Sequence, residues 1–84
     1  MRGGIRGNYG VVRITAGTHK GKLGYYDNED ERGKAIVYLE GSRLLSAEYV
    51  SIAFRNLARV EVTSLNIERF KREHPGLARA AGIR

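Results

Sequence analysis

The apolar residues of this chain change their spacing once, and the change falls at Thr63. From Val11 to Val62, short apolar runs alternate with polar residues and are rich in β-branched and aromatic side chains. Clusters of Gly, Asn and Asp separate these runs, which is the pattern of short β-strands joined by turns. After Thr63 the spacing of the apolar residues becomes helical. The chain is therefore predicted to be mainly β, with an α-helix at its C-terminal end.

The alternating runs predict five short strands, at Val11–Ala16, Lys22–Asp27, Lys34–Leu39, Glu48–Ile52 and Arg59–Val62. Five strands in roughly fifty residues imply a barrel or a tightly bent sheet, because closure removes the exposed edges that a small flat sheet would leave. The polar stretch Asn28–Gly33 predicts the hairpin loop between the second and third strands. Ala53–Ala58 predicts one 3₁₀ turn before the last strand, with Phe54 and Leu57 pointing into the end of the barrel.

Caps and charges predict a helix over Leu65–Glu73. Ser64 or Thr63 can serve as its N-cap, and Pro75 ends it. Its apolar stripe, which is expected to dock on the barrel, consists of Leu65, Ile67 and Phe70. Residues 77–84 are expected either to form another turn or to fray. The predicted parts of the chain are a basic, glycine-rich N-terminal arm (1–10), a barrel (11–63), and a C-terminal helix with its tail (64–84).

The length and the absence of cysteine exclude several classes of protein. With 84 residues the chain can build one small hydrophobic core, and without cysteine it can form neither disulfides nor a zinc finger. No apolar run approaches the ~20 residues that cross a bilayer, and the first residues lack the apolar segment of a signal peptide. We therefore expect a monomeric cytoplasmic domain that has no membrane partner and holds no metal or cofactor.

Positive charge is concentrated in two parts of the chain. The net charge is +6, and residues 1–26 carry five cations and no acid, whereas residues 27–40 carry five acids against two cations. Residues 64–84 are again basic, with five cations against two acids. Eleven of the fifteen cations are arginine, whose planar fork suits phosphate and carboxylate groups. The distribution favours a polyanionic partner, although a basic domain that is merely soluble remains the alternative.

One segment carries a resemblance to a known family. Residues 12–26 read VRITAGTHKGKLGYY. They resemble the KOW motif of several ribosomal proteins and of transcription elongation factors of the NusG type, in which an apolar-basic-apolar strand precedes Gly, two variable residues, Lys-Gly-Lys, an apolar residue and Gly. The resemblance covers 27 residues, Val11–Val37. The strand–3₁₀–strand order that follows is similar to that of SH3-like barrels. The resemblance thus implies a small SH3-like (KOW-type) five-stranded barrel.

The glycines of this segment make a prediction about the tyrosines that follow them. Gly17 and Gly21 bracket a turn, where glycine permits a positive φ at little cost. Gly24 inside a strand indicates either a bulge or a close approach of another strand. Simple alternation would bury Tyr25, whereas the resemblance places Tyr26 in the core. We adopt the bulge, with Tyr25 exposed; an ordinary cross-strand pair of Tyr25 is the alternative.

The resemblance implies two kinds of function. In ribosomal members such a barrel binds RNA through the turn and its basic residues, and in elongation factors related barrels often contact polymerase or other proteins. We therefore predict a nucleic-acid-binding module for RNA or a ribonucleoprotein, and retain a non-catalytic protein-interaction domain, docking through the helix that carries Phe70, Arg69 and Arg72, as the alternative. The candidate nucleic-acid-binding residues are Arg13, His19, Lys20, Lys22, Tyr25, Arg2 and Arg6.

These candidates have different expected roles. Arg13, Lys20 and Lys22 would neutralise phosphates, and the residues at 2 and 6 would form a flexible basic arm. An exposed Tyr25 would supply a stacking surface for unpaired bases beside these cations. His19 would act as a donor in the turn and is expected to be solvated, because the only other histidine lies far along the chain.

Catalytic and metal motifs do not match. The turn glycines Gly17 and Gly21 are separated by three residues where a P-loop needs four, and Leu23 stands where a P-loop has Ser or Thr. No serine lies in the Gly-x-Ser-x-Gly context of a nucleophile elbow. The acidic cluster of residues 27–31 lacks the twelve-residue frame of a calcium-binding loop. We therefore predict that the protein is not an enzyme.

Overall fold

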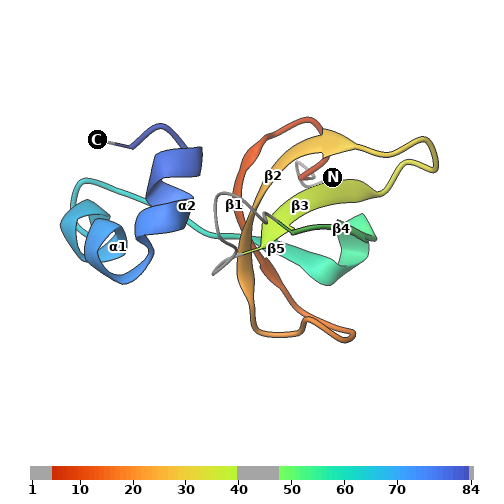
Figure 1. Ribbon diagram of the computed structural model, residues 1–84, viewed down its shortest axis with the longest axis horizontal. Coiled ribbons are helices and arrows are strands. Elements are labelled where there is room, and N and C mark those ends of the chain that lie inside the picture. The colour runs from red at the N-terminus through yellow and green to blue at the C-terminus, as the bar shows by residue number, and fades with distance from the viewer. Residues whose placement is uncertain (1–4, 40–47, 84) are drawn as a thin grey trace.

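A computed structural model describes residues 5–39 and 48–83 (Figure 1). Its elements are β1 (Gly10–Ile14), β2 (Leu23–Glu29), β3 (Ala35–Leu39), β4 (Tyr49–Ile52), the 3₁₀ helix η2 (Phe54–Asn56), β5 (Leu57–Arg59), α1 (Ile67–Glu73) and α2 (Pro75–Ala80). Neither helix in the described ranges has the length and apolar character needed to cross a membrane. Arg2, one of the candidate nucleic-acid-binding residues, lies outside the described residues.

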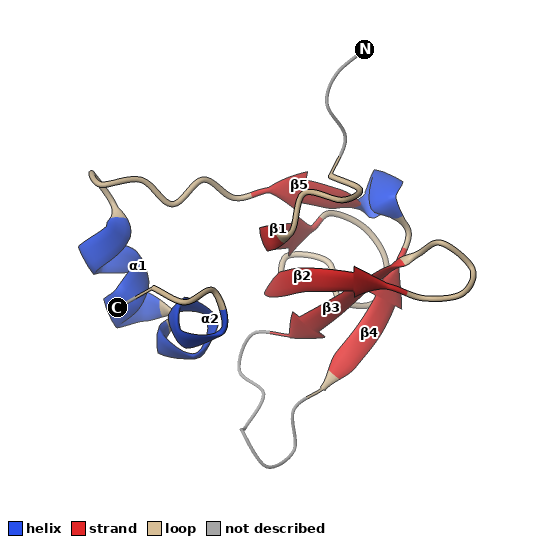
Figure 2. Cartoon of the chain, turned by 90° about the horizontal axis from the view of Figure 1, so that it is seen from above, coloured by secondary structure: helices blue, strands red, loops and turns tan. Residues whose placement is uncertain are grey.

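The five strands form one open antiparallel sheet in the order β4-β3-β2-β1-β5. Only residues 53–56 join the two edge strands, β4 and β5, and three of these form η2. A 3₁₀ helix advances about 2 Å per residue, whereas the outer strands of a flat five-stranded sheet lie roughly 19 Å apart. So short a connection requires the sheet to bend until its edges approach each other, as Figure 2 shows.

The sheet buries apolar side chains on both of its faces. The inner face, enclosed by the bend, holds the cluster of Val12, Ile14, Tyr26, Ala35, Val37, Leu39 and Leu57. The outer face packs against the C-terminal helices through Val11, Leu23, Tyr38, Phe70, Leu77 and Ala78. Both helices lie on this outer side of the sheet (Figure 1). Burial on both faces explains why the strand Ala35–Leu39 is almost wholly apolar.

All five predicted strands are present, and the largest displacement is at the last one. β5 occupies Leu57–Arg59, directly after η2, because Leu57 pairs with Ile14 of β1. The predicted direction of the residues around η2 is confirmed. Leu57 is buried in the inner cluster, and Phe54 packs against it. Residues three apart thus lie on the same, inward-facing side of the 3₁₀ turn.

The bulge predicted at Gly24 is wrong in position. Gly24 pairs regularly with β1 and β3, and the register shifts instead between Tyr26 and Asn28, which leaves Asp27 as the extra residue. The alternative reason for a glycine holds: a Cβ at Gly24 would lie 2.4 Å from Val37 Cγ1 and 2.7 Å from the Tyr38 carbonyl oxygen. A neighbouring strand thus approaches too closely for any side chain at this position.

The two tyrosines of β2 follow ordinary alternation across a sheet that is buried on both faces. Tyr26 is fully buried in the inner cluster, as predicted. Tyr25 is half-buried rather than exposed, because its outer face is partly covered by the C-terminal helices. It forms the cross-strand pairs with Val11 and Tyr38 that the alternative interpretation expected.

The C-terminal segment forms two helices, and the predicted start of the first is wrong. Thr63 Oγ1 accepts the Leu65 amide, and Asn66 Oδ1 accepts the Thr63 amide, so these residues form a turn before α1 begins at Ile67. Leu65 is 96% exposed and does not dock. Pro75 ends α1 as predicted but also opens α2, where its fixed φ suits the first helical position.

Candidate nucleic-acid interface

The turn over residues 17–21 is held by backbone hydrogen bonds alone. The Lys20 amide donates to the Gly17 carbonyl oxygen (3.1 Å), and the Gly21 amide donates to the Ile14 carbonyl oxygen (2.7 Å). Gly17 and Gly21 have φ values of 93° and 91°. A Cβ at either glycine would meet nothing within 4 Å, so glycine is required here for its backbone conformation and not for space. The turn therefore keeps its form without using its side chains.

The side chains of Lys20, in the turn, and of Lys22, directly after it, take no part in these hydrogen bonds. Lys20 and Lys22 are both exposed. Neither forms an ion pair with a carboxylate of the described residues. Arg13 shares the outer face with Leu23 and lines a hollow together with Glu61 and Glu73 of the C-terminal segment. Lys20 and Lys22 do not line that hollow.

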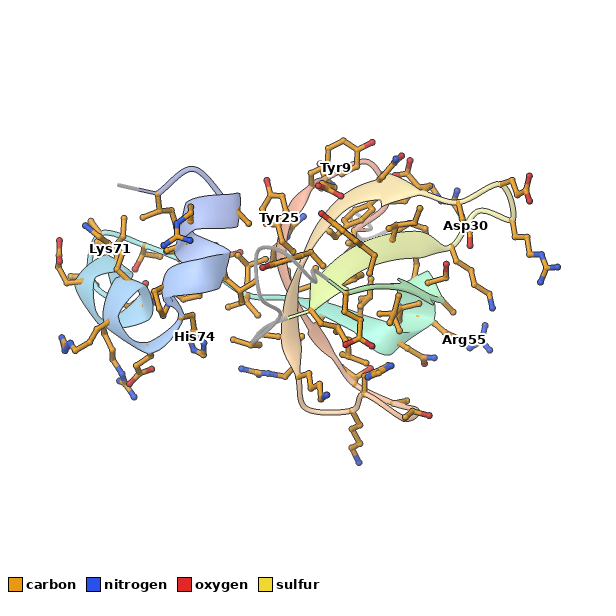
Figure 3. The ribbon with its side chains drawn as sticks, in the orientation of Figure 1. Tyr9, Tyr25, Asp30, Arg55, Lys71 and His74 are labelled. Atoms are coloured by element: carbon orange, nitrogen blue, oxygen red, sulfur yellow. The ribbon has the colours of Figure 1, made fainter. Side chains whose placement is uncertain are left out.

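A hollow of about 420 Å³ lies between this turn and the chain that runs from β4 into η2. Its polar and basic lining consists of Thr18, His19, Lys34, Ser51, Arg55 and Asn56. Arg55 and Lys34 are exposed at this hollow, and Figure 3 shows Arg55 on the side of the sheet away from the helices. No carboxylate lines it among the described residues. Hydroxyl, amide and cationic groups of this kind are the usual donors to phosphate oxygens.

One acid lies beside the hollow. The Asp30 carboxylate accepts the amides of Lys34 (2.9 Å) and Arg32 (2.8 Å). The hydrogen bond from the Lys34 amide, helped by the Ser51 hydroxyl and the Arg32 amide, lowers the pKa of Asp30 below its ordinary value of 3.8. Asp30 is therefore charged at neutral pH, but its carboxylate is occupied by its own loop. Its negative charge partly neutralises the positive charge of Lys34, whereas the positive charge of Arg55 is not reduced by it.

His19 differs from its predicted state. Its side chain is half-buried, and its Nδ1 is shielded from solvent without a hydrogen-bond partner in the described residues. The ring borders the hollow rather than standing free in solvent.

The other two predicted contacts are not part of this surface. Tyr25 lies beside the C-terminal helices and away from Arg55 (Figure 3), and it does not line this hollow. Arg6 is placed against the sheet: its guanidinium lies 4.7 Å from the centre of the Phe54 ring and donates to the Gly33 carbonyl oxygen (3.4 Å). The segment that precedes β1 is therefore packed at Arg6 rather than forming a free arm.

Sequence reasoning missed Lys34 and Arg55. The signal for Arg55 was present, because Phe54 and Leu57 point inward from the 3₁₀ turn and the two residues between them, Arg55 and Asn56, then point away from the core. No local signal marked Lys34. Its position depends on how the hairpin between β2 and β3 folds toward Ser51 of β4.

The helix proposed as an alternative docking element uses its apolar side internally. Phe70 is only 8% exposed and packs in the outer cluster. On the exposed side, Arg69 pairs with Glu73 at 3.2 Å. The described residues contain no group of three side chains suited to a metal ion. Comparisons with protein-family models, with curated proteins and with solved structures find no match to this chain.

Proposed function

We propose that this protein is a nucleic-acid-binding module that holds the phosphates of RNA. The proposed site, called here the basic surface, consists of Lys34 and Arg55, which line the hollow that His19 borders, and of Lys20 and Lys22 on the adjoining turn. We further propose that the bent five-stranded sheet is a KOW-type SH3-like barrel. The resemblance of residues 12–26 to the KOW motif and the 3₁₀ helix between the last two strands support this assignment.

The observation that carries the proposal is the state of the turn lysines. Lys20 and Lys22 are exposed and form no ion pair with a carboxylate of the described residues, and the hydrogen bonds of the turn use only their backbone atoms. The same turn borders a hollow with two further cations and several neutral donors. Cations that stabilise nothing in the protein are available to replace the counterions of a polyanion.

The number of cations sets the expected salt dependence. Four phosphate contacts on a single strand predict that the logarithm of the binding constant falls with the logarithm of salt concentration at a slope of about −3. Contacts of this type give affinity without reading the base sequence. Binding through the basic surface should therefore be similar for single-stranded RNAs of different sequence.

The test is a fluorescence-anisotropy titration of labelled single-stranded RNA and duplex DNA at several salt concentrations. Lys20→Glu/Lys22→Glu should weaken RNA binding about tenfold or more and make the salt slope shallower by about 1.4. The matched control, Arg69→Glu/Arg72→Glu on α1, changes the net charge equally but alters no residue of the basic surface. Equal losses in both variants would show that only net charge matters, and unchanged RNA affinity in the turn variant would refute the site.

A further inference from the structure

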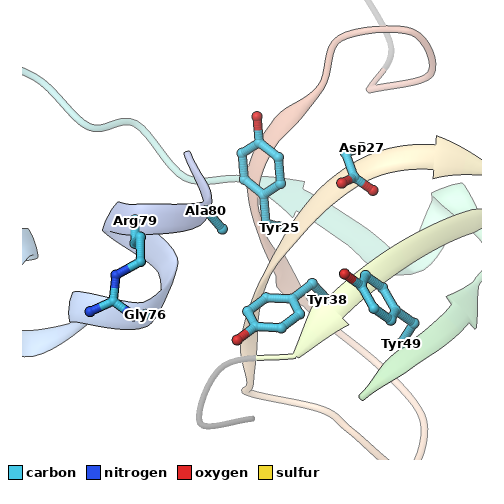
Figure 4. A pocket seen from close by; sticks show the side chains of 7 residues that line it. All are labelled: Tyr25, Asp27, Tyr38, Tyr49, Gly76, Arg79 and Ala80. Atoms are coloured by element: carbon cyan, nitrogen blue, oxygen red, sulfur yellow. The ribbon is translucent and has the colours of Figure 1, made fainter. Parts of the chain in front are cut away.

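A second hollow lies on the outer face of the sheet, opposite α2 (Figure 4). Its volume is about 330 Å³, at the lower end of the range for small-ligand sites. Tyr25, Tyr38 and Tyr49 line it from the sheet, and Gly76 and Ala80 line it from the helix. We call it the tyrosine cleft. It shares no lining residue with the basic surface.

The three tyrosines are brought together by the strand register. Tyr25 of β2 pairs with Tyr38 of β3, which pairs in turn with Tyr49 of β4, so one row of rings crosses three strands on the same face. The rings of Tyr38 and Tyr49 lie 5.5 Å apart between centroids and are tilted by 56°. Tyr38 is 9% exposed and Tyr49 is 56% exposed. Tyr38 thus forms a fixed floor, while Tyr49 offers much of its ring to a ligand.

The opposite wall leaves room for a flat group. Gly76 has no side chain, and a Cβ placed there would meet nothing within 4 Å. Ala80, one helical turn further along α2, carries only a methyl group. Small residues facing a row of aromatic rings form a slot, and a planar ring that enters it can stack on tyrosine.

Two opposite charges border the slot and restrict its ligand. Asp27, the extra residue of the β2 bulge, extends its carboxylate toward the space between Tyr25 and Tyr49 (Figure 4). A carboxylate only accepts hydrogen bonds, so the planar group must present donors on its edge. Arg79 of α2 supplies a cation on the other wall, which suits a phosphate attached to that group.

We propose that the tyrosine cleft binds an unpaired guanine nucleotide of an RNA. The ring would stack on Tyr49, its N1–H and N2–H₂ groups would donate to the Asp27 carboxylate, and its phosphate would contact Arg79. Guanine presents two adjacent donors on its Watson–Crick edge, whereas adenine, cytosine and uracil each present an acceptor next to their donor. The net charge of +6 favours an anionic nucleotide over a cationic side chain as the occupant.

The ligand class of this inference rests on the proposed function, and the two can be tested separately. Guanosine and adenosine monophosphate carry equal charge, and their binding can be followed by NMR through the ring signals of the tyrosines. Guanosine monophosphate should shift these signals in a saturable way and bind about tenfold more tightly than adenosine monophosphate. Asp27→Asn should abolish that preference, and Tyr49→Ala, at an exposed position, should weaken binding of both nucleotides about tenfold.

The variants of the basic surface separate the two proposals. Lys20→Glu/Lys22→Glu should retain the guanine preference, and Asp27→Asn should retain the salt slope for an RNA that lacks guanine. If the lysine variant keeps full RNA affinity while guanosine monophosphate still binds, only the basic surface is refuted. Equal affinity for the two nucleotides, an unchanged preference in Asp27→Asn, or shifts produced by an arginine-containing peptide but by neither nucleotide would overturn the guanine site.

Discussion

Gly24→Ala tests how closely β2 and β3 approach each other. The added Cβ would lie 2.4 Å from Val37 Cγ1 and 2.7 Å from the Tyr38 carbonyl oxygen, whereas ordinary van der Waals contact begins at 3.4 Å. Val37 is fully buried in the inner cluster, and the carbonyl group belongs to the backbone, so β3 must retreat by about 1 Å. Overpacking of this kind lowers the free energy of unfolding by about 1–3 kcal/mol. Alanine also reduces the backbone entropy of the unfolded chain, which raises the free energy of unfolding by about 0.5–1 kcal/mol.

Subtracting the middle of the second range from the middle of the first leaves an expected net loss in the free energy of unfolding of about 1.3 kcal/mol, which lowers Tm by about 5–10 °C in a domain of this size. Thermal unfolding followed by circular dichroism measures it. Two matched controls separate steric crowding from backbone strain as the cause of the loss. Gly21→Ala has open space but φ of +91° and should cost about 1–2 kcal/mol from backbone strain alone. Gly76→Ala has open space and needs no positive φ, so it should raise the free energy of unfolding by about 0.4–1 kcal/mol. A Tm for Gly24→Ala at or above that of the wild type would refute the close approach.

Three further measurements address single side chains. The pKa of Tyr26 is raised above 10.0, first by burial and then by the hydrogen bond to the Glu29 carboxylate. The stability that this raised pKa contributes is therefore complete below pH 10 and is lost as the pH rises through the folded-state pKa. In urea unfolding, the free energy of unfolding of Tyr26→Phe should decline less steeply at alkaline pH than that of the wild type. The pKa of Asp30 is lowered, chiefly by the Lys34 amide, so Asp30→Ala should lower Tm at pH 7, and the difference should vanish as the pH falls below 3.8 through the folded-state pKa. Leu65→Ser should change the free energy of unfolding by less than about 0.5 kcal/mol, and a larger loss would mean that this side chain docks.

The sequence predicts the strands because alternation and turn chemistry are local. Its failure at Tyr25 concerns what covers the sheet. Alternation along β2 places Tyr25 and Tyr26 on opposite faces, but it does not tell whether one face or both are buried. Here the helices cover the outer face through Phe70 and Leu77, so both tyrosines lose exposure. The expectation that one tyrosine is buried and its neighbour exposed holds only for a sheet with one solvated face.

The candidate site likewise has a part that the sequence predicts and a part that it does not. The turn that carries Lys20 and Lys22 is defined by two glycines four residues apart, and the sequence suffices to find it. Arg55 joins it only because the sheet bends, which brings the 3₁₀ helix between the edge strands next to the first hairpin turn. Contacts between segments that are distant along the chain depend on this tertiary arrangement, and no local pattern encodes them.

The C-terminal helices also determine which surfaces remain for a ligand. They bury Val11, Leu23 and Tyr38 on the outer face, and the bend encloses the inner cluster, so neither face of the sheet is open as a whole. The hollow beside the turn and the slot left by Gly76 are then two places where polar or aromatic side chains border free space. Because removal of the helices would expose the outer cluster, such a deletion would change stability and binding together. Point substitutions at exposed residues are therefore the changes that can separate the two sites.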